Sequence, residues 1–86
     1  MFIFTIYDTI SEKPGNIFTT ATIGEAERQF HDALLNAQEG SLFQSHPTDF
    51  ALYLLGEFDE NKMEIVDTKT QEITKGRPAA LTEVSA

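Results

Sequence analysis

The stretch from Phe50 to Asp67, FALYLLGEFDENKMEIVD, constrains the fold more than any other part of the chain. Apolar residues occupy both faces of an extended backbone as far as Gly56. Such a strand is expected to be covered on both sides, or on one side and at a contact with a partner. The turn-forming run from Asp59 to Lys62 then interrupts the pattern before a second β-rich run begins. The stretch predicts a β-hairpin, and because an isolated hairpin is marginally stable, the rest of the chain must supply another strand and a helix.

Two strand candidates precede the hairpin. The run from Phe2 to Asp8 alternates large apolar side chains on one face and predicts a strand that begins almost at the N-terminus. Pro14 and Gly15 predict a turn. The short β-rich run from Ile17 to Thr20 predicts either an edge strand or an extended approach to the helix.

A single helix is predicted between the two β-rich regions. Thr22 and Glu25 match the capping-box pattern, in which the threonine side chain accepts a hydrogen bond from the backbone three residues on. Apolar residues then recur at helical spacing, which predicts a helix from about Ile23 to Gln38 with one apolar stripe. Gly40 suits the left-handed backbone conformation that often follows a helix.

These elements predict an α+β fold, a small β-β-α-β-β sandwich in which a three- to four-stranded, mainly antiparallel sheet has one helix packed on one face. A further β segment is expected around Gln71 to Thr74. Residues 1–78 are expected to form this single domain, and residues 79–86 a flexible or docking C-terminal tail. Since one helix covers one face only, Tyr7, Tyr53 and Leu55 on the other face are the candidate surface for a homo-oligomer, most simply a dimer.

The charge balance argues against a surface that binds phosphates along the whole chain. Acidic residues outnumber basic ones by 14 to 6, for a net charge of −8, whereas nucleic-acid-binding domains usually carry a basic footprint. The candidate nucleic-acid contacts are Lys69, Lys75 and Arg77, which could neutralise two or three phosphates in a weak, salt-sensitive complex. The alternative interpretation of this basic stretch is a solvated linker.

Nothing in the sequence predicts catalysis, a metal site or a cofactor. The chain has no cysteine, and its two histidines, His31 and His46, lack the spacing of known metal motifs. Ser45, His46 and Asp49 are too close in sequence to face one another as a hydrolytic triad requires. We also expect no signal peptide and no membrane helix, because the N-terminus has no basic segment and the longest apolar run is six residues, Phe50 to Leu55.

One run of residues carries a resemblance to a known family. It reads His46-Pro47-Thr48-Asp49-Phe50-x-Leu52-Tyr53-x-Leu55-Gly56-Glu57-Phe58-Asp59, and it is accompanied by Tyr7-Asp8, Ile17-Phe18 and Arg28-Gln29-Phe30. In this order and at this chain length the run resembles the small nonstructural protein of gokushovirus-type microviruses, which are bacteriophages with single-stranded DNA. The resemblance implies a DNA-binding or packaging-associated protein of the infected cell, and it carries over no catalytic residues.

The resemblance leads to two hypotheses about function. The first is a non-enzymatic phage accessory protein in the host bacterial cytoplasm that assists single-stranded DNA synthesis or genome packaging. It would act by weak single-stranded DNA binding or by binding the replication initiator or the procapsid. The alternative is an acidic protein-interaction module, either a host-factor inhibitor or a DNA mimic, that makes no contact with DNA.

Overall fold

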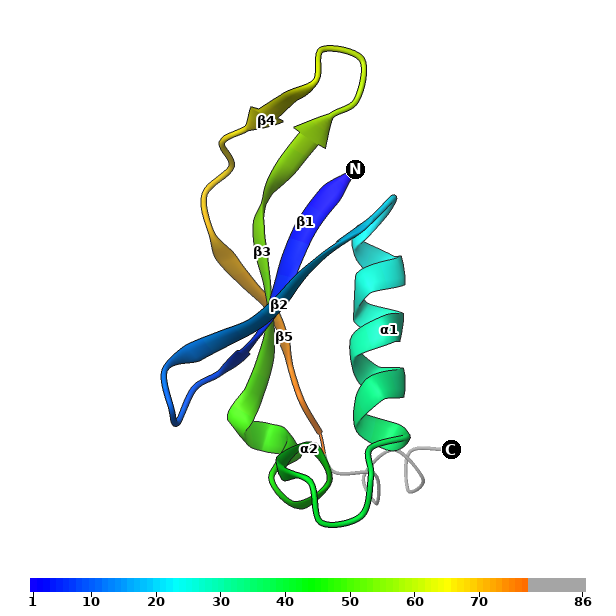
Figure 1. The fold of residues 1–86 in the computed structure, drawn as a ribbon, viewed down its shortest axis with the longest axis vertical. Coiled ribbons are helices and arrows are strands. Elements are labelled where there is room, and N and C mark those ends of the chain that lie inside the picture. Colours follow the sequence, from blue (N-terminus) through cyan, green and yellow to red (C-terminus); the bar gives the residue numbers. More distant parts are fainter. Residues whose placement is uncertain (78–86) are drawn as a thin grey trace.

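Two central strands, β1 and β3, organise the sheet in the computed structural model, which describes residues 1–77 (Figure 1). The sheet is antiparallel, has the strand order β2-β1-β3-β4, and adds β5 on β3. In chain order the elements are β1 (Phe2–Asp8), β2 (Lys13–Thr20), α1 (Ile23–Leu35), α2 (Leu42–Ser45), a 3₁₀ turn η1 (Pro47–Asp49), β3 (Phe50–Asp59), β4 (Glu64–Val66) and β5 (Gln71–Lys75). This confirms a small α+β fold with one main helix.

The sheet has five strands where the sequence predicted three or four, because β4 and β5 share one edge of β3. β4 pairs with Glu57 to Asp59 at the far end of β3, and β5 pairs with Ala51 to Leu54 near its start. At any one level the sheet is therefore at most four strands wide. The predicted tail at residues 79–86 lies outside the described residues.

Side chains cap both ends of helix α1, Thr22 at its start and Asn36 at its end. Thr22 Oγ1 accepts the backbone N–H of Glu25 at 3.1 Å, as the capping pattern predicts. The helix ends at Leu35, earlier than the predicted end at about Gln38. The side-chain amide of Asn36 donates to the carbonyl oxygen of Asp32 at 2.9 Å, and the next backbone bond, from Ala37 N–H to Leu34 O, spans three residues and not four. Gly40 does adopt a left-handed conformation, with φ of 86°, but in the turn beyond the helix.

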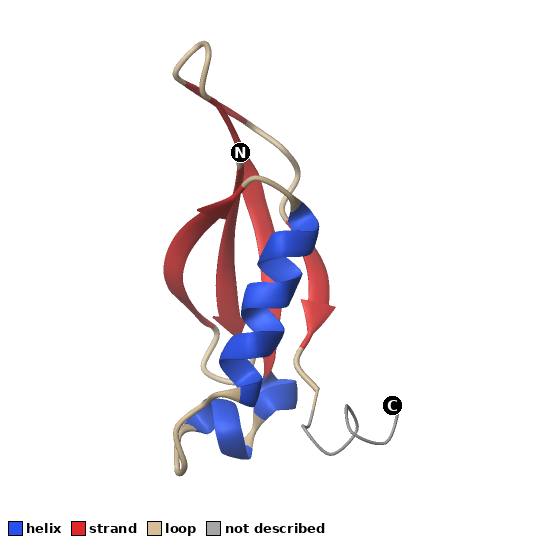
Figure 2. Ribbon diagram, turned by 90° about the vertical axis from the view of Figure 1, so that its right-hand side faces the viewer, coloured by secondary structure: helices blue, strands red, loops and turns tan. Residues whose placement is uncertain are grey.

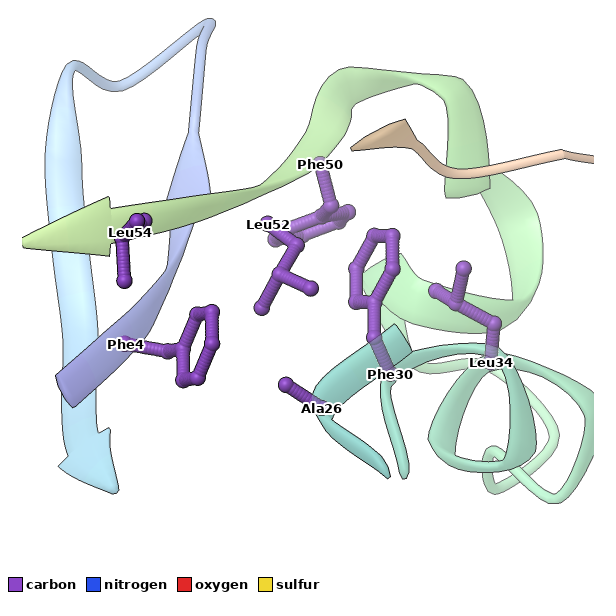
Figure 3. Packing of buried hydrophobic residues seen from close by; sticks show 7 residues of the cluster. All are labelled: Phe4, Ala26, Phe30, Leu34, Phe50, Leu52 and Leu54. Atoms are coloured by element: carbon purple, nitrogen blue, oxygen red, sulfur yellow. The ribbon is translucent and has the colours of Figure 1, made fainter. Parts of the chain in front are cut away.

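The core lies between α1 and one face of the sheet, which we call the inner face (Figures 2 and 3). Phe30 from the helix is fully buried, as are Phe4 of β1 and Leu52 of β3. Each such side chain contributes about 1.5–3 kcal/mol to stability through its removal from water. The buried cluster consists of Phe4, Ala26, Phe30, Leu34, Phe50, Leu52 and Leu54.

The predicted turn at Pro14-Gly15 is wrong, since both residues lie inside β2. The turn comes earlier, after Asp8, whose carboxylate accepts the backbone N–H groups of Ile10 at 3.0 Å and Ser11 at 3.3 Å. Desolvation acts to raise the pKa of Asp8, but these hydrogen bonds outweigh it and hold that pKa below its ordinary value. Pro14 is tolerated because β2 is an edge strand, where a missing N–H need not break a ladder bond.

A bulge in β3 moves Phe58 away from the face that the alternation pattern predicts. Ile3 pairs with Gly56, whereas Phe4 pairs with Leu54, so Leu55 is an extra residue in β3. Because the side-chain period of a strand is two, one extra residue transfers all later side chains to the opposite face. Phe58 therefore does not join the core.

Gly76 generates a prediction about stability. This buried residue follows β5 and donates its backbone N–H to Phe50 O at 2.8 Å. A Cβ at this position would overlap the carbonyl oxygen of Pro47 and lie 3.0 Å from Leu34 Cδ1. We expect Gly76→Ala to lower the free energy of unfolding by about 1–3 kcal/mol, measured by urea denaturation.

The matched control is Gly24→Ala in the first turn of α1, where the nearest atom to a new Cβ is Thr22 Oγ1 at 4.0 Å. This variant should gain about 0.5–1 kcal/mol, because alanine loses less conformational entropy than glycine in a helix. Equal effects of the two substitutions would contradict the packing described at Gly76.

Candidate functional site

The face of the sheet opposite α1, here called the outer face, is the main candidate for a functional surface. Pairing places Thr5 beside Tyr53 and Tyr7 beside Ala51 on this face. The rings of Tyr7 and Tyr53 meet edge to face, with centroids 5.4 Å apart. A hollow of about 370 Å³ lies around them, and its lining consists of Thr5, Tyr7, Pro14, Tyr53, Leu55 and Thr70.

Thr5 supports the shape of this hollow. Its side chain is 3% exposed, and its hydroxyl donates toward the carbonyl oxygens of Gly15 at 3.1 Å and Asn16 at 3.2 Å. These two residues belong to the irregular part of β2, where the register with β1 shifts between Thr5 and Tyr7. The shift leaves Pro14 paired with Tyr7, and so brings the proline ring to the hollow.

The structure thus brings together the three residues that the sequence suggests for an oligomer interface, Tyr7, Tyr53 and Leu55. Sequence reasoning missed Thr5, Pro14 and Thr70. The alternation of β1 predicts that Thr5 lies on the same face as Tyr7. The position of Pro14 depends on the register of β2 against β1, which no local sequence pattern predicts. A role of these residues in self-association stays a prediction.

The three candidate DNA contacts lie in different places. Lys69 precedes β5 and Lys75 ends it, so the length of β5, about 13 Å at 3.3 Å per residue, separates them. Lys75 is paired with Ala51 and belongs to the outer face. Arg77 lines a different cavity of about 350 Å³, beside Leu34 and Leu35 of the helix. The sequence-based idea of one basic stretch therefore corresponds to three separate exposed cations, and their contact with DNA stays a prediction.

The β3–β4 end of the sheet carries the densest negative charge. We call Glu57–Val66 the hairpin arm. Asp59 stabilises its turn, because its carboxylate accepts the backbone N–H groups of Asn61 at 3.0 Å and Lys62 at 3.2 Å. Asp59 is also directly paired with Glu64 across the two strands. Two like charges in this position repel each other.

Ser45 and His46 make hydrogen bonds within their own short segment. Ser45 Oγ donates to Ser41 O at 3.0 Å, a bond within the short helix α2, and lies 2.9 Å from Nδ1 of the adjacent His46. Both residues are exposed. Among residues 1–77, no group of three or more His, Asp or Glu side chains is placed to hold a metal ion. No helix within that range is long and apolar enough to cross a membrane.

His31 is the histidine with a perturbed environment. It lies half-buried on α1, with its ring 5.2 Å from the ring of Phe30. Burial lowers the pKa of His31 below its ordinary value of 6.5, and the positive charge of Arg77 lowers it further, while Glu27 and Asp32 act in the opposite direction.

The facing pair Asp59 and Glu64 predicts a stabilising substitution. We expect Glu64→Lys to raise the free energy of unfolding by about 0.5 kcal/mol, because an opposite-charge pair replaces a like-charge pair. Glu60→Lys, which makes the same change in charge in the exposed turn, is the control. Denaturation at low salt and at about 1 M salt checks this, because screening should remove most of the difference between the two variants. A gain from Glu60→Lys as large as that from Glu64→Lys would show that net charge alone is responsible.

The environment of His31 predicts a pH dependence. Its folded-state pKa is depressed, so the unfolded state binds more protons near pH 6. The stability that His31 contributes is therefore present above its ordinary pKa of 6.5 and is lost as the pH falls through the folded-state pKa. We expect His31→Gln to flatten the rise in Tm between about pH 5 and pH 7.5. His46→Gln, which removes an exposed histidine, is the control substitution. Parallel curves for the wild type and His31→Gln would contradict this assignment.

Comparison with known proteins places the chain in a family. A family model described as "Phage ORF5 protein" matches residues 1–78, which is nearly the whole chain. A search of curated proteins and a search of solved structures found no match.

Proposed function

The chain belongs to the Phage ORF5 protein family, and on this premise we propose that it is a non-enzymatic accessory protein that assists single-stranded DNA synthesis or genome packaging. It does so by binding a protein of the replication or packaging machinery, the replication initiator or the procapsid. The finer assignment to gokushovirus-type microviruses is part of this proposal and rests on the run from His46 to Asp59. The host bacterial cytoplasm is the proposed place of action.

The hairpin arm is the observation that carries the proposal. It projects past the end of α1 and past the N-terminus of β1 (Figure 1). Its second strand, β4, is paired with β3, and all three of its residues are exposed. An element that extends beyond the core in this way is available to a partner without any rearrangement of the fold.

The chemistry of the arm favours a protein partner with a basic surface. Its carboxylates, Glu57, Asp59, Glu60 and Glu64, outnumber its one cation, Lys62. Two apolar side chains of the arm are also exposed: Met63 is 81% exposed and Ile65 is 72% exposed. Exposed apolar side chains supply area that binding can remove from water, and complementary charge speeds the encounter and selects the partner.

Direct binding of single-stranded DNA is the second candidate function, and one observation favours it. Lys75 belongs to the same face as the half-buried pair Tyr7 and Tyr53. Aromatic rings on a sheet face can stack with bases while a neighbouring cation contacts the phosphates. With so few cations on that face, such binding would be weak and would fall steeply with salt.

Two binding measurements test the proposal. The purified chain is titrated with the phage replication initiator and with procapsids by biolayer interferometry, and with single-stranded DNA by fluorescence anisotropy, at low and at physiological salt. We expect binding to one of the proteins that weakens at least tenfold in Glu60→Lys/Glu64→Lys. The control, Glu25→Lys/Glu27→Lys on α1, makes the same change in net charge and should bind like the wild type.

The remaining outcomes overturn the proposed route. Micromolar binding to DNA at low salt, lost in Lys75→Ala and without binding to either protein, would replace it by the second candidate. Two results would show that the hairpin arm is not the binding surface: no binding to either protein or to DNA, or equal weakening of binding in the arm variant and in the helix variant.

A further inference from the structure

The outer face is apolar and neutral at its centre, although the chain carries a net charge of −8. None of the six residues that line its hollow is charged. Ile17, which pairs with Thr5 on the same face, is 67% exposed. An apolar sheet face that the helix leaves uncovered is typical of an interaction surface.

Half of the 14 acidic residues lie on two other parts of the molecule. The helix α1 carries three of them on the opposite side, and the hairpin arm carries four more. Two copies of a strongly acidic protein repel each other over most of their surfaces. The outer face is where two copies can approach with the least repulsion.

The size of this face suits a modest dimer. Four neighbouring strands about 4.8 Å apart make a face about 19 Å wide, and seven residues of β1 at about 3.3 Å each make it roughly 23 Å long. Two such faces would together bury about 900 Å² measured as flat area, and more once the relief of the side chains is included. That lies near the lower limit for a specific interface, where transient and weak dimers occur.

We propose that the outer face binds the same face of a second copy, about a two-fold axis that crosses the strands between the level of Ala51 and the level of Tyr53. The axis lies in the plane of the interface, at right angles to the strands. Each strand of one copy therefore faces the same strand of the other copy and runs antiparallel to it. The interface is then isologous, with the same patch contributed by both copies.

The two rows of side chains next to this axis are complementary in size. Tyr53 of each copy lies over Ala51 of the other, and Tyr7 lies over Thr5, because Ala51 pairs with Tyr7 at one level and Tyr53 pairs with Thr5 at the next. Ala51 is fully buried and Thr5 is only 3% exposed, so the tyrosine rings supply the accessible surface at these two levels. The axis places each ring opposite a small residue and not opposite another ring.

The same axis brings opposite charges together at the edge of the interface, along β5, which we call the rim. Lys75 pairs with Ala51, and Glu72 pairs with Tyr53, so these two opposite charges occupy the two levels on either side of the axis. Both side chains are exposed. In the dimer, Glu72 of each copy lies over Lys75 of the other, so that two ion pairs form at the edge of the interface.

A charge-swap series tests this arrangement by sedimentation equilibrium of the full chain. We expect a wild-type dimer with a micromolar Kd. Glu72→Lys and Lys75→Glu should each weaken it about three- to tenfold, because each places like charges opposite one another. The double variant Glu72→Lys/Lys75→Glu restores both pairs and should return the Kd to within about twofold of the wild-type value.

Two control variants separate this from a general effect of net charge. Glu25→Lys matches the charge change of Glu72→Lys, and Lys62→Glu matches that of Lys75→Glu, and neither residue is on the proposed interface. Three results would each overturn the proposal: a wild-type chain that is monomeric at millimolar concentration, a Kd that neither single variant changes, or a Kd that the double variant does not restore.

Thermal denaturation of every variant verifies the fold. Because the proposed function relies on the hairpin arm and not on this rim, either idea can fail while the other stands.

Discussion

One helix can cover only one face of a sheet, and the exposed chemistry of this protein follows from that constraint. The stripe of Ala26, Phe30 and Leu34 meets Phe4 and the inward side chains of β3, and together they form the buried cluster. The same strands carry Tyr7 and Tyr53 on their other side, with no helix from the described part of the chain packed over them (Figure 2). A two-layer domain of this size therefore ends with an apolar face toward solvent.

The change in burial along the central strand β3 also determines where carboxylates are tolerated. It is buried where β1 and β5 flank it, and its side chains become partly exposed beyond the bulge at Leu55, where it leaves the core. Carboxylates would be costly in the first part but are well solvated in the hairpin arm, even where Asp59 faces Glu64. The fold thus separates an acidic arm from a neutral face, and the two surfaces suit different partners.

Much of the fold was predictable because its signals are local. The alternation in β1, the threonine cap of α1 and the Asp59 turn all depend on residues a few positions apart, and the structure has each of them. The errors lie where local signals compete with pairing. Pro14-Gly15 is a strong turn signal, yet the turn formed at Asp8 and the proline was accommodated in an edge strand. The helix also ends earlier than predicted, at Leu35, where the side-chain amide of Asn36 caps the carbonyl oxygen of Asp32.

The sequence alone predicts most of the elements, their amphipathic faces and the concentration of acid in the hairpin, since these depend on side-chain periods and composition. It also pointed to Tyr7, Tyr53 and Leu55 as neighbours on one face, and they do surround one hollow. The tertiary structure decided that Lys69, Lys75 and Arg77 lie apart, that Glu72 and Lys75 flank adjacent levels of the outer face, and that Phe58 changes sides at the bulge. The reason is physical: strand register and bulges are set by contacts between residues far apart in the chain, and a shift of one residue reverses every face that follows.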